Sequence, residues 1–154
     1  IRIVDLADSR LTAVKLGESA MRICAAPGYL ERWGTPRDLK ELTEQHQLLI
    51  PEFVNVSEQL RRLFPVGERP HVDMAKAHRI DSESALFAAM ESGLGVGFVL
   101  DIAAKQAIDQ SRLVTLLPES PLPSQPIYLV YRRADVSPAR LEALKMFLLR
   151  HFRS

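Results

Sequence analysis

The nucleophilic and metal-binding side chains of this sequence have a spacing that fits no serine, cysteine or metal site. The single cysteine, Cys24, has no CxxC partner, and no GxSxG turn is present. A hydrolase or transferase would need folding to bring Ser82 or Ser84 to His78 as nucleophile and base. No metal-ligand spacing connects the four histidines, which are His46, His71, His78 and His151. The residue types favour a non-catalytic protein without metal or cofactor, and a hydrolase or transferase is the alternative.

Three glycines, Gly93, Gly95 and Gly97, invite comparison with a loop that cradles the phosphates of a dinucleotide. That fingerprint requires a strand, then the glycines, then a helix. Here the flanking patterns come in the reverse order, and Phe98 stands where the third glycine of the motif belongs. We therefore interpret the glycines as a helix terminator followed by a place of close strand packing.

A helix is predicted to start at Asp81 or Ser82. Either side chain can cap the first turn, and the negative charge of Glu83 suits the positive end of the helix dipole. An apolar stripe at a spacing of four residues must face a core: Leu86, Met90 and Leu94.

The continuous apolar run Val96–Leu100 predicts a strand that is covered on both faces of a parallel or mixed sheet. In open α/β sheets, ligands bind beside the carboxyl ends of strands and the amino ends of helices. The end of this strand and the helix start at Asp81 are therefore two candidate ligand positions, and the helix end would suit an anionic or polar ligand.

The other elements follow from shorter patterns. Thr35, with Pro36 after it, predicts the cap of a short helix, and the prolines of 118–126 predict a stiff connector loop. The stretch 51–67 carries both helix and strand signals, so both remain open. We also expect strands over 1–4, 11–16, 21–26, 47–50, 72–77, 112–117 and 127–131, and helices over 102–108 and after Pro138 with Leu141, Leu144 and Leu148 on one face.

Composition limits where the protein acts. The 154 residues suffice for one ordinary domain, and no apolar run approaches the roughly 20 residues of a membrane span. The first residues do not indicate export, and one cysteine fits a reducing compartment, so we expect a cytoplasmic protein without membrane contact. With 20 basic and 19 acidic residues, the chain lacks the basic excess of a self-sufficient DNA-binding protein.

Several short motifs occur in an order and spacing that resemble one family, and they cover nearly the whole chain. They are residues 8–11, 24–30, 34–39, 81–101, 112–114, 117–118 and 127–131. With them the chain resembles the effector-sensing domain of LysR-type bacterial transcriptional regulators. The resemblance implies an α/β fold like that of periplasmic solute-binding proteins, in which two subdomains are joined by two crossover strands around a small-molecule cleft. Such a domain senses an effector and performs no chemistry.

The resemblance also implies residue roles. Subdomain I would comprise residues 1–23 and 131–154, and subdomain II residues 24–130. The crossover strands would form the hinge, at Ile23, Cys24, Val130 and Tyr131. The effector cleft would be lined by Arg2, Ile3, Asp81, Ser82, Val99 and Leu100.

Two of these positions leave alternatives open. Arg2 interrupts an apolar strand, so it lies either on a solvated edge or in the cleft, where its guanidinium would hold a carboxylate. Many family members have proline where this chain has Leu100, which changes the expected wall of the cleft.

The chain opens on Ile1-Arg2-Ile3-Val4, as if inside a strand, and we expect a fragment whose first subdomain is incomplete. The resemblance implies that DNA is bound only through a helix-turn-helix that would precede this point, and that the full-length protein is a homo-oligomer. The effector would be a small molecule, such as a small organic acid. A solute-binding receptor of a transport system shares the architecture and is a further alternative, although it would require an export leader.

Overall fold

The computed structural model describes residues 12–52, 56, 76–120, 122–132 and 137–152. The chain forms two compact units, residues 1–19 with 124–154 (unit 1) and residues 20–123 (unit 2). Both boundaries fall inside strands, since one strand continues past Ser19 and another past Pro123. The subdomain boundaries expected from the sequence were 23/24 and 130/131, and that assignment stays a prediction.

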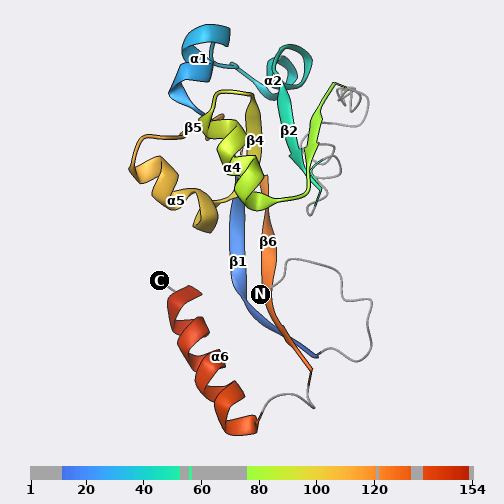
Figure 1. The fold of residues 1–154 in the computed structure, drawn as a ribbon, viewed down its shortest axis with the longest axis vertical. Helices are drawn as coiled ribbons and strands as arrows, with labels where there is room; N and C mark the ends of the chain where they lie inside the picture. The colour runs from blue at the N-terminus through green and yellow to red at the C-terminus, as the bar shows by residue number, and fades with distance from the viewer. Residues whose placement is uncertain (1–11, 53–55, 57–75, 121, 133–136, 153–154) are drawn as a thin grey trace. The chain divides into compact units, whose positions relative to one another are not determined.

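The strands form one mixed sheet in the order β3-β2-β4-β1-β5, with β6 also paired to β1 (Figure 1). β2 runs parallel to β3 and β4, whereas β1 runs antiparallel to β4 and β5. The mixed α/β character predicted from the sequence is confirmed. The bounds are β1 Thr12–Ala25, β2 Leu48–Pro51, β3 His78–Ile80, β4 Val96–Leu100, β5 Val114–Leu116 and β6 Leu122–Tyr131.

The long strands differ from the prediction in two places. The runs 11–16 and 21–26 were expected to be separate strands, but β1 continues through Gly17 without a break. β6 begins at Leu122, so Pro123 and Pro126 lie in a strand rather than in a connector loop. Proline has no backbone N–H to donate, and this is tolerated on the side of a strand that has no neighbouring strand. The only described partner of β6 is β1, so β6 has such a side. The strand expected over 72–77 lies almost entirely outside the described residues, and β3 begins after it.

Four helices flank the strands of unit 2 in the described part of the chain. The cap of α2 is Asp38, which accepts a hydrogen bond from the Glu41 amide at 2.7 Å, and not Thr35 as the sequence suggested. Pro27 follows the end of β1 and occupies the first position of α1, where a missing amide hydrogen costs nothing. The helices are α1 Pro27–Trp33, α2 Leu39–Gln45, α4 Glu83–Glu91 and α5 Asp101–Asp109.

The prediction for α4 is confirmed at its start and in its core contacts. Ser82 caps the helix by accepting a hydrogen bond from the Ala85 amide, and Leu86 and Met90 are fully buried. The expectation for Leu94 was wrong, because its side chain is 49% exposed. The helix ends at Glu91, and Gly93, at φ 76°, turns the chain away before Leu94.

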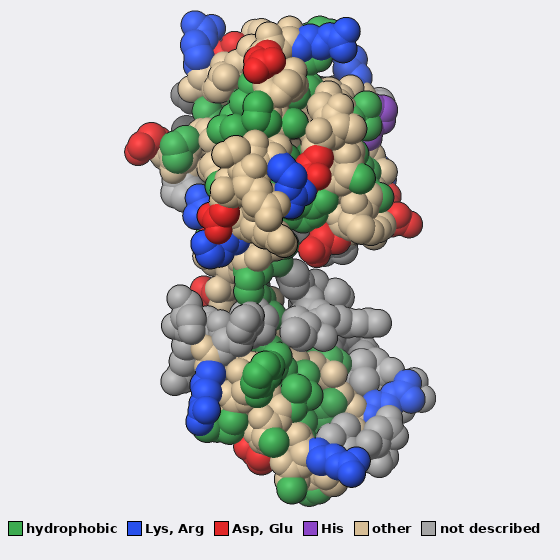
Figure 2. All heavy atoms as spheres, turned by 60° about the vertical axis from the view of Figure 1, so that its left-hand side comes forward, with side chains coloured by type: hydrophobic (Ala, Val, Ile, Leu, Met, Phe, Trp, Pro, Cys, Tyr) green, Lys and Arg blue, Asp and Glu red, His purple; other side chains and the backbone are tan. Residues whose placement is uncertain are grey.

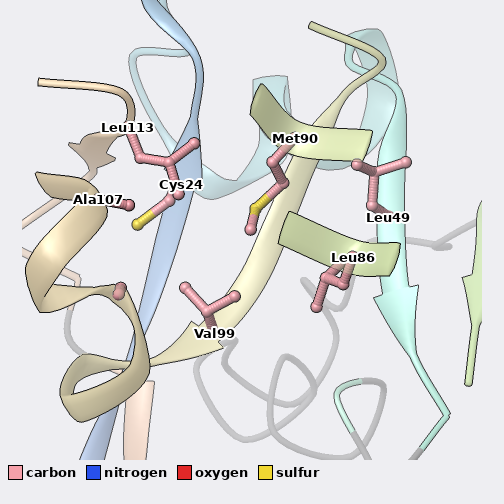
Figure 3. Close-up of a cluster of buried hydrophobic side chains, with 8 residues drawn as sticks. Cys24, Leu49, Leu86, Met90, Val99, Ala107 and Leu113 are labelled. Atoms are coloured by element: carbon pink, nitrogen blue, oxygen red, sulfur yellow. The ribbon is translucent and has the colours of Figure 1, made fainter. Parts of the chain in front are cut away.

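The main core of unit 2 lies where α4 and α5 cover the sheet. Leu86 and Met90 reach from α4 toward β4, and Cys24 on β1 lies near Leu113 and Ala107 (Figure 3). The approach of α4 depends on Gly97, since a Cβ there would come within 2.3 Å of the Met90 sulfur. The buried cluster comprises Cys24, Leu49, Leu86, Met90, Val99, Ala104, Ala107 and Leu113.

Unit 1 contains helix α6 (Pro138–Phe152), which packs on residues of β1 and β6. Leu141 and Leu148 pack there as the sequence predicted, but Leu144 is 45% exposed. Hydrophobic side chains gather on the face of unit 1 shown in Figure 2, and Leu144, Met146 and Phe147 are exposed large apolar residues of the described part of the helix. Among the described helices, none combines the length and apolar character that crossing a membrane requires.

Candidate functional site

The start of α4 and the end of β4, two positions singled out in the sequence, line one small hollow. We call it the α4–β4 hollow. Glu83 contributes from the first turn of α4, and Val99 and Leu100 contribute from the carboxyl end of β4. The remaining lining is apolar, so the hollow has one polar rim on the helix side. Its full lining is Met21, Glu83, Leu86, Phe87, Phe98, Val99, Leu100 and Ala103.

Hydroxyl groups lie at the start of α4. The Ser82 Oγ lies 3.0 Å from the Ser84 Oγ and 3.4 Å from the Ala85 amide nitrogen that it caps. Asp81 precedes them with an exposed side chain. Backbone amides without helical acceptors and the positive end of the helix dipole favour an anion or a polar acceptor at such a position. These residues are not among those that line the α4–β4 hollow, but they neighbour Glu83, the one polar side chain among its described lining residues, whose carboxylate accepts hydrogen bonds.

Val99 and Leu100 contribute only apolar surface. Both are buried, and Val99 belongs to the hydrophobic core cluster. Leu100 also occupies the position before the first turn of α5, with an extended backbone and no side-chain cap. A ligand near this strand end would therefore meet aliphatic carbon rather than a hydrogen-bonding side chain.

An ion pair that the sequence reasoning missed lies beside the same strand end. Arg22 on β1 pairs with Asp101, the first residue of α5, and both side chains are partly exposed. Arg22 is opposite Val99 in the antiparallel register, which brings its guanidinium to the end of β4. The local signals were an arginine inside an apolar strand and an aspartate directly after another strand. No local pattern connects them, because they are 79 residues apart.

The predicted hinge residues lie in the two crossover strands, two in each unit. Ile23 and Cys24 are buried in β1 within unit 2, and Val130 and Tyr131 are half-buried in β6 within unit 1. Burial raises the pKa of the Cys24 thiol to about 11, which keeps it protonated near neutral pH. Their role as a hinge stays a prediction. Arg2 and Ile3 lie outside the described residues.

The geometry does not assemble the nucleophile and base of the alternative enzyme. The Ser82 and Ser84 hydroxyls bond to each other, and in the described part of the chain neither makes a hydrogen bond to His78. Over the same residues, histidine, cysteine and carboxylate side chains form no group of three that could hold a metal ion.

A larger hollow, of about 660 Å³, lies at the opposite ends of the strands in unit 2. Leu48 and His78, which line it, are the first residues of β2 and β3, and Leu94 precedes β4. The sequence reasoning did not predict it. The one available signal was Trp33, the single tryptophan of the chain, at the end of a short helix.

Comparison with known proteins places these features in a family context. The family model of the LysR substrate binding domain matches residues 1–153. The HTH-type transcriptional activator AaeR of Escherichia coli K12 is 25% identical over 164 aligned positions, which cover 99% of this chain and 48% of that protein. An uncharacterized HTH-type transcriptional regulator of Haemophilus influenzae is also 25% identical, over 95% of this chain and 50% of its own length.

Solved structures show the same architecture. The regulatory domain of CrgA, a LysR-type transcriptional regulator from Neisseria meningitidis, superposes with a TM-score of 0.79 at 27% identity, covering 98% of this chain and 73% of that one. The effector domain of AmpR of Pseudomonas aeruginosa superposes with a TM-score of 0.76 over 96% of this chain and 68% of that one, and at 16% identity this likeness concerns the fold alone. The periplasmic-binding-protein-like fold expected from the sequence is thereby confirmed. The chain spans about half the length of the curated relatives that it matches.

Proposed function

Because the chain belongs to the LysR substrate-binding domain family, we propose that it is the non-catalytic, ligand-sensing domain of a transcription regulator. The observation that carries the proposal is the family match over residues 1–153, and the α4–β4 hollow supports it. DNA would be bound by a separate part of the protein, as the names of the full-length relatives suggest. A homo-oligomer in the cytoplasm is the proposed form of the whole regulator.

The proposed effector is a small organic acid bound at the start of α4, beside the α4–β4 hollow. The amides and hydroxyls at Asp81, Ser82 and Ser84 would face its carboxylate, because the helix dipole favours negative charge at this end. Val99 and Leu100 would contact its apolar part. This division supports an amphiphilic ligand rather than a purely charged one.

The proposed response is a change in the angle between the subdomains. Ile23, Cys24, Val130 and Tyr131 would act as the hinge, since both strands that contain them belong to both units. A ligand that also contacts Arg2 and Ile3 would favour the closed state by its differential affinity for that state. Coupling of about 1–3 kcal/mol is the usual size of such an effect.

Binding of the ligand carboxylate at the start of α4 can be tested with two variants of Ser82 that are isosteric with each other. Ser82→Asn and Ser82→Asp both retain a good helix cap, so α4 should persist in each. Only the aspartate adds a negative charge where the proposed carboxylate binds. We expect Ser82→Asp to weaken binding by about 10-fold or more relative to Ser82→Asn, because like charges at this distance repel.

The measurement is calorimetric titration of small aromatic and aliphatic acids into the full-length regulator that contains this chain. Circular dichroism of both variants verifies that the helix is retained. The proposed site is refuted if the acids bind the two variants equally, and the proposed ligand class is refuted if none of the acids binds the unsubstituted regulator.

A further inference from the structure

We propose that unit 2 carries a second small-molecule site, for a neutral, planar heteroaromatic molecule, in the hollow at the amino ends of β2 and β3. We call it the Trp33 hollow. Its volume of about 660 Å³ falls in the range of ordinary ligand sites, roughly 300–1,000 Å³. The residues that carry the argument are Tyr29, Trp33, His46, Gln47, His78 and Leu94.

The Trp33 hollow is separate from the site proposed for the effector. The two hollows share no described lining residue. β4 runs from the Leu94 side to Leu100, and its five residues span about 16 Å. A ligand of one or two rings cannot occupy both positions at once.

One wall of the Trp33 hollow is an exposed aromatic surface. The Trp33 side chain is 64% exposed and Leu94 is 49% exposed, although they come from different elements. Isolated exposed apolar residues are common, but these two line the same concave surface. The flat indole face suits a stacked planar ring, because offset stacking adds to the gain from apolar burial.

Another part of the lining carries a hydrogen-bonded relay. The Gln47 amide donates to the Tyr29 hydroxyl oxygen at 3.1 Å, and that hydroxyl lies 3.2 Å from His46 Nδ1. We assign the phenolic proton to the bond with Nδ1, which leaves the imidazole proton on Nε2. In the described part of the chain Nε2 has no partner, so the relay offers one donor to a ligand acceptor.

The charges of the lining favour a neutral ligand. Burial lowers the pKa of His46, so its imidazole is uncharged near neutral pH. Glu44 and Lys76, which have opposite signs, also belong to the described lining. Neither sign is in excess among these described residues, so they give an ion no electrostatic preference.

The relay alone has a structural explanation, since it ties α1 to the turn before β2 through the buried Tyr29. That explanation does not require Trp33, which takes no part in the hydrogen bonds among Tyr29, His46 and Gln47. The aromatic wall therefore decides between the two interpretations, and it can be altered without disturbing the buried residues.

Trp33 also provides the readout, because it is the only tryptophan in the chain. We would titrate nicotinamide, benzimidazolone and isoquinolinone into the 154-residue chain and follow tryptophan emission and heat. At the binding efficiency of small ligands, we expect a saturable change with a dissociation constant on the order of 1 mM or lower for at least one of them. No saturable signal from any of the three would overturn the proposal.

Two comparisons isolate the aromatic contact. Trp33→Leu should weaken heteroaromatic binding by about 5-fold or more, whereas Trp33→Phe should stay within about 2-fold, both measured by calorimetry. Cyclohexanecarboxamide, which keeps the amide of nicotinamide without its aromatic ring, should bind at least about 5-fold more weakly. Equal binding to Trp33→Leu, or equal binding of the saturated amide, would overturn the proposal.

The same probes test the preference for a neutral ligand and the position at which nicotinamide binds. Benzoate should not compete with nicotinamide for the Trp33 hollow, and Ser82→Asp should bind nicotinamide as the unsubstituted chain does. Loss of nicotinamide binding in Ser82→Asp would place the probe at the start of α4 and overturn the second site. If the organic acids did not bind at the start of α4, the results with nicotinamide would be unaffected. The two proposals can therefore fail separately.

Discussion

At the residue scale, Cys24 shows how its surroundings set the chemistry of a side chain. The side chain is completely buried in β1, with an exposed fraction of 0%. Desolvation by burial is the main cause that raises the pKa of the thiol to about 11, against a smaller lowering by a hydrogen bond with Thr115. A thiol in this state is a weak nucleophile at neutral pH, so Cys24 acts in packing.

This shift predicts how stability depends on pH. The thiol has an ordinary pKa of 9.0 when unfolded and about 11 when folded, so between these values the folded state holds more protons. The free energy of unfolding should therefore fall as the pH rises through this window, by up to about 3 kcal/mol from this group. Urea unfolding of the unsubstituted chain and of Cys24→Ala at about pH 8 and about pH 11 isolates the contribution.

The difference between the two proteins is the quantity to examine, because tyrosine and lysine residues titrate in the same window in both. We expect the unsubstituted chain to lose more stability than Cys24→Ala over this rise in pH. Parallel losses in the two proteins would mean that the thiol ionises as easily when folded as when unfolded.

At the scale of elements, the turn from α4 to β4 depends on three glycines for three different reasons. Gly93 adopts a positive φ of 76°, which ends the helix. Gly97 allows α4 to approach β4 at Met90. Gly95 lies against the chain before β2, where a Cβ would come within 2.6 Å of the Gln47 carbonyl oxygen. That carbonyl also accepts the Val96 amide at 2.8 Å, so it cannot move away freely.

Gly95→Ala should therefore destabilise unit 2 by about 1–3 kcal/mol, since the new methyl group meets backbone rather than a movable side chain. The matched control is Gly28→Ala in α1, where a Cβ meets nothing within 4 Å. Alanine is the better helix former, so the control should be neutral or stabilising by at most about 1 kcal/mol.

Urea unfolding monitored by the emission of Trp33, which lies in unit 2, measures both glycine variants. Equal stabilities for Gly95→Ala and Gly28→Ala would show that the Gln47 backbone shifts without cost. The close packing at this turn would then not constrain the sequence.

At the scale of the whole molecule, the near-neutral charge of the chain bears on its affinity for DNA. The chain has 20 basic and 19 acidic residues, and on the face of unit 2 shown in Figure 2 the two signs are interspersed. Affinity for DNA comes largely from counterions that clustered lysine and arginine residues release from the phosphates. A near-neutral, mixed surface releases few of them.

We therefore expect the 154-residue chain to bind duplex DNA with a dissociation constant weaker than about 10⁻⁴ M at physiological salt. Fluorescence anisotropy of a labelled duplex at low and physiological salt measures this. Any binding at low salt should decrease steeply as salt is added. Micromolar binding that persists at physiological salt would contradict the assignment of DNA binding to a separate part of the regulator.

The sequence by itself determined the features that depend on neighbours along the chain. Ser82 was recognised as a cap because the amide that it accepts is three residues away, and Leu86 and Met90 share a face because a helix repeats every 3.6 residues. The run 96–100 was recognised as a covered strand for the same kind of reason. The ordered motifs also sufficed to identify the family.

Tertiary structure alone decided what depends on contacts between distant segments. Arg22 meets Asp101 only because β1 and β4 are paired, and the Trp33 hollow exists only because α1 lies beside the starts of β2 and β3. Leu94 matched the apolar spacing of α4 but is exposed, because the chain leaves the helix at Gly93. Periodicity specifies which side chains share a face, whereas packing of the whole chain decides which faces are covered and where space remains for a ligand.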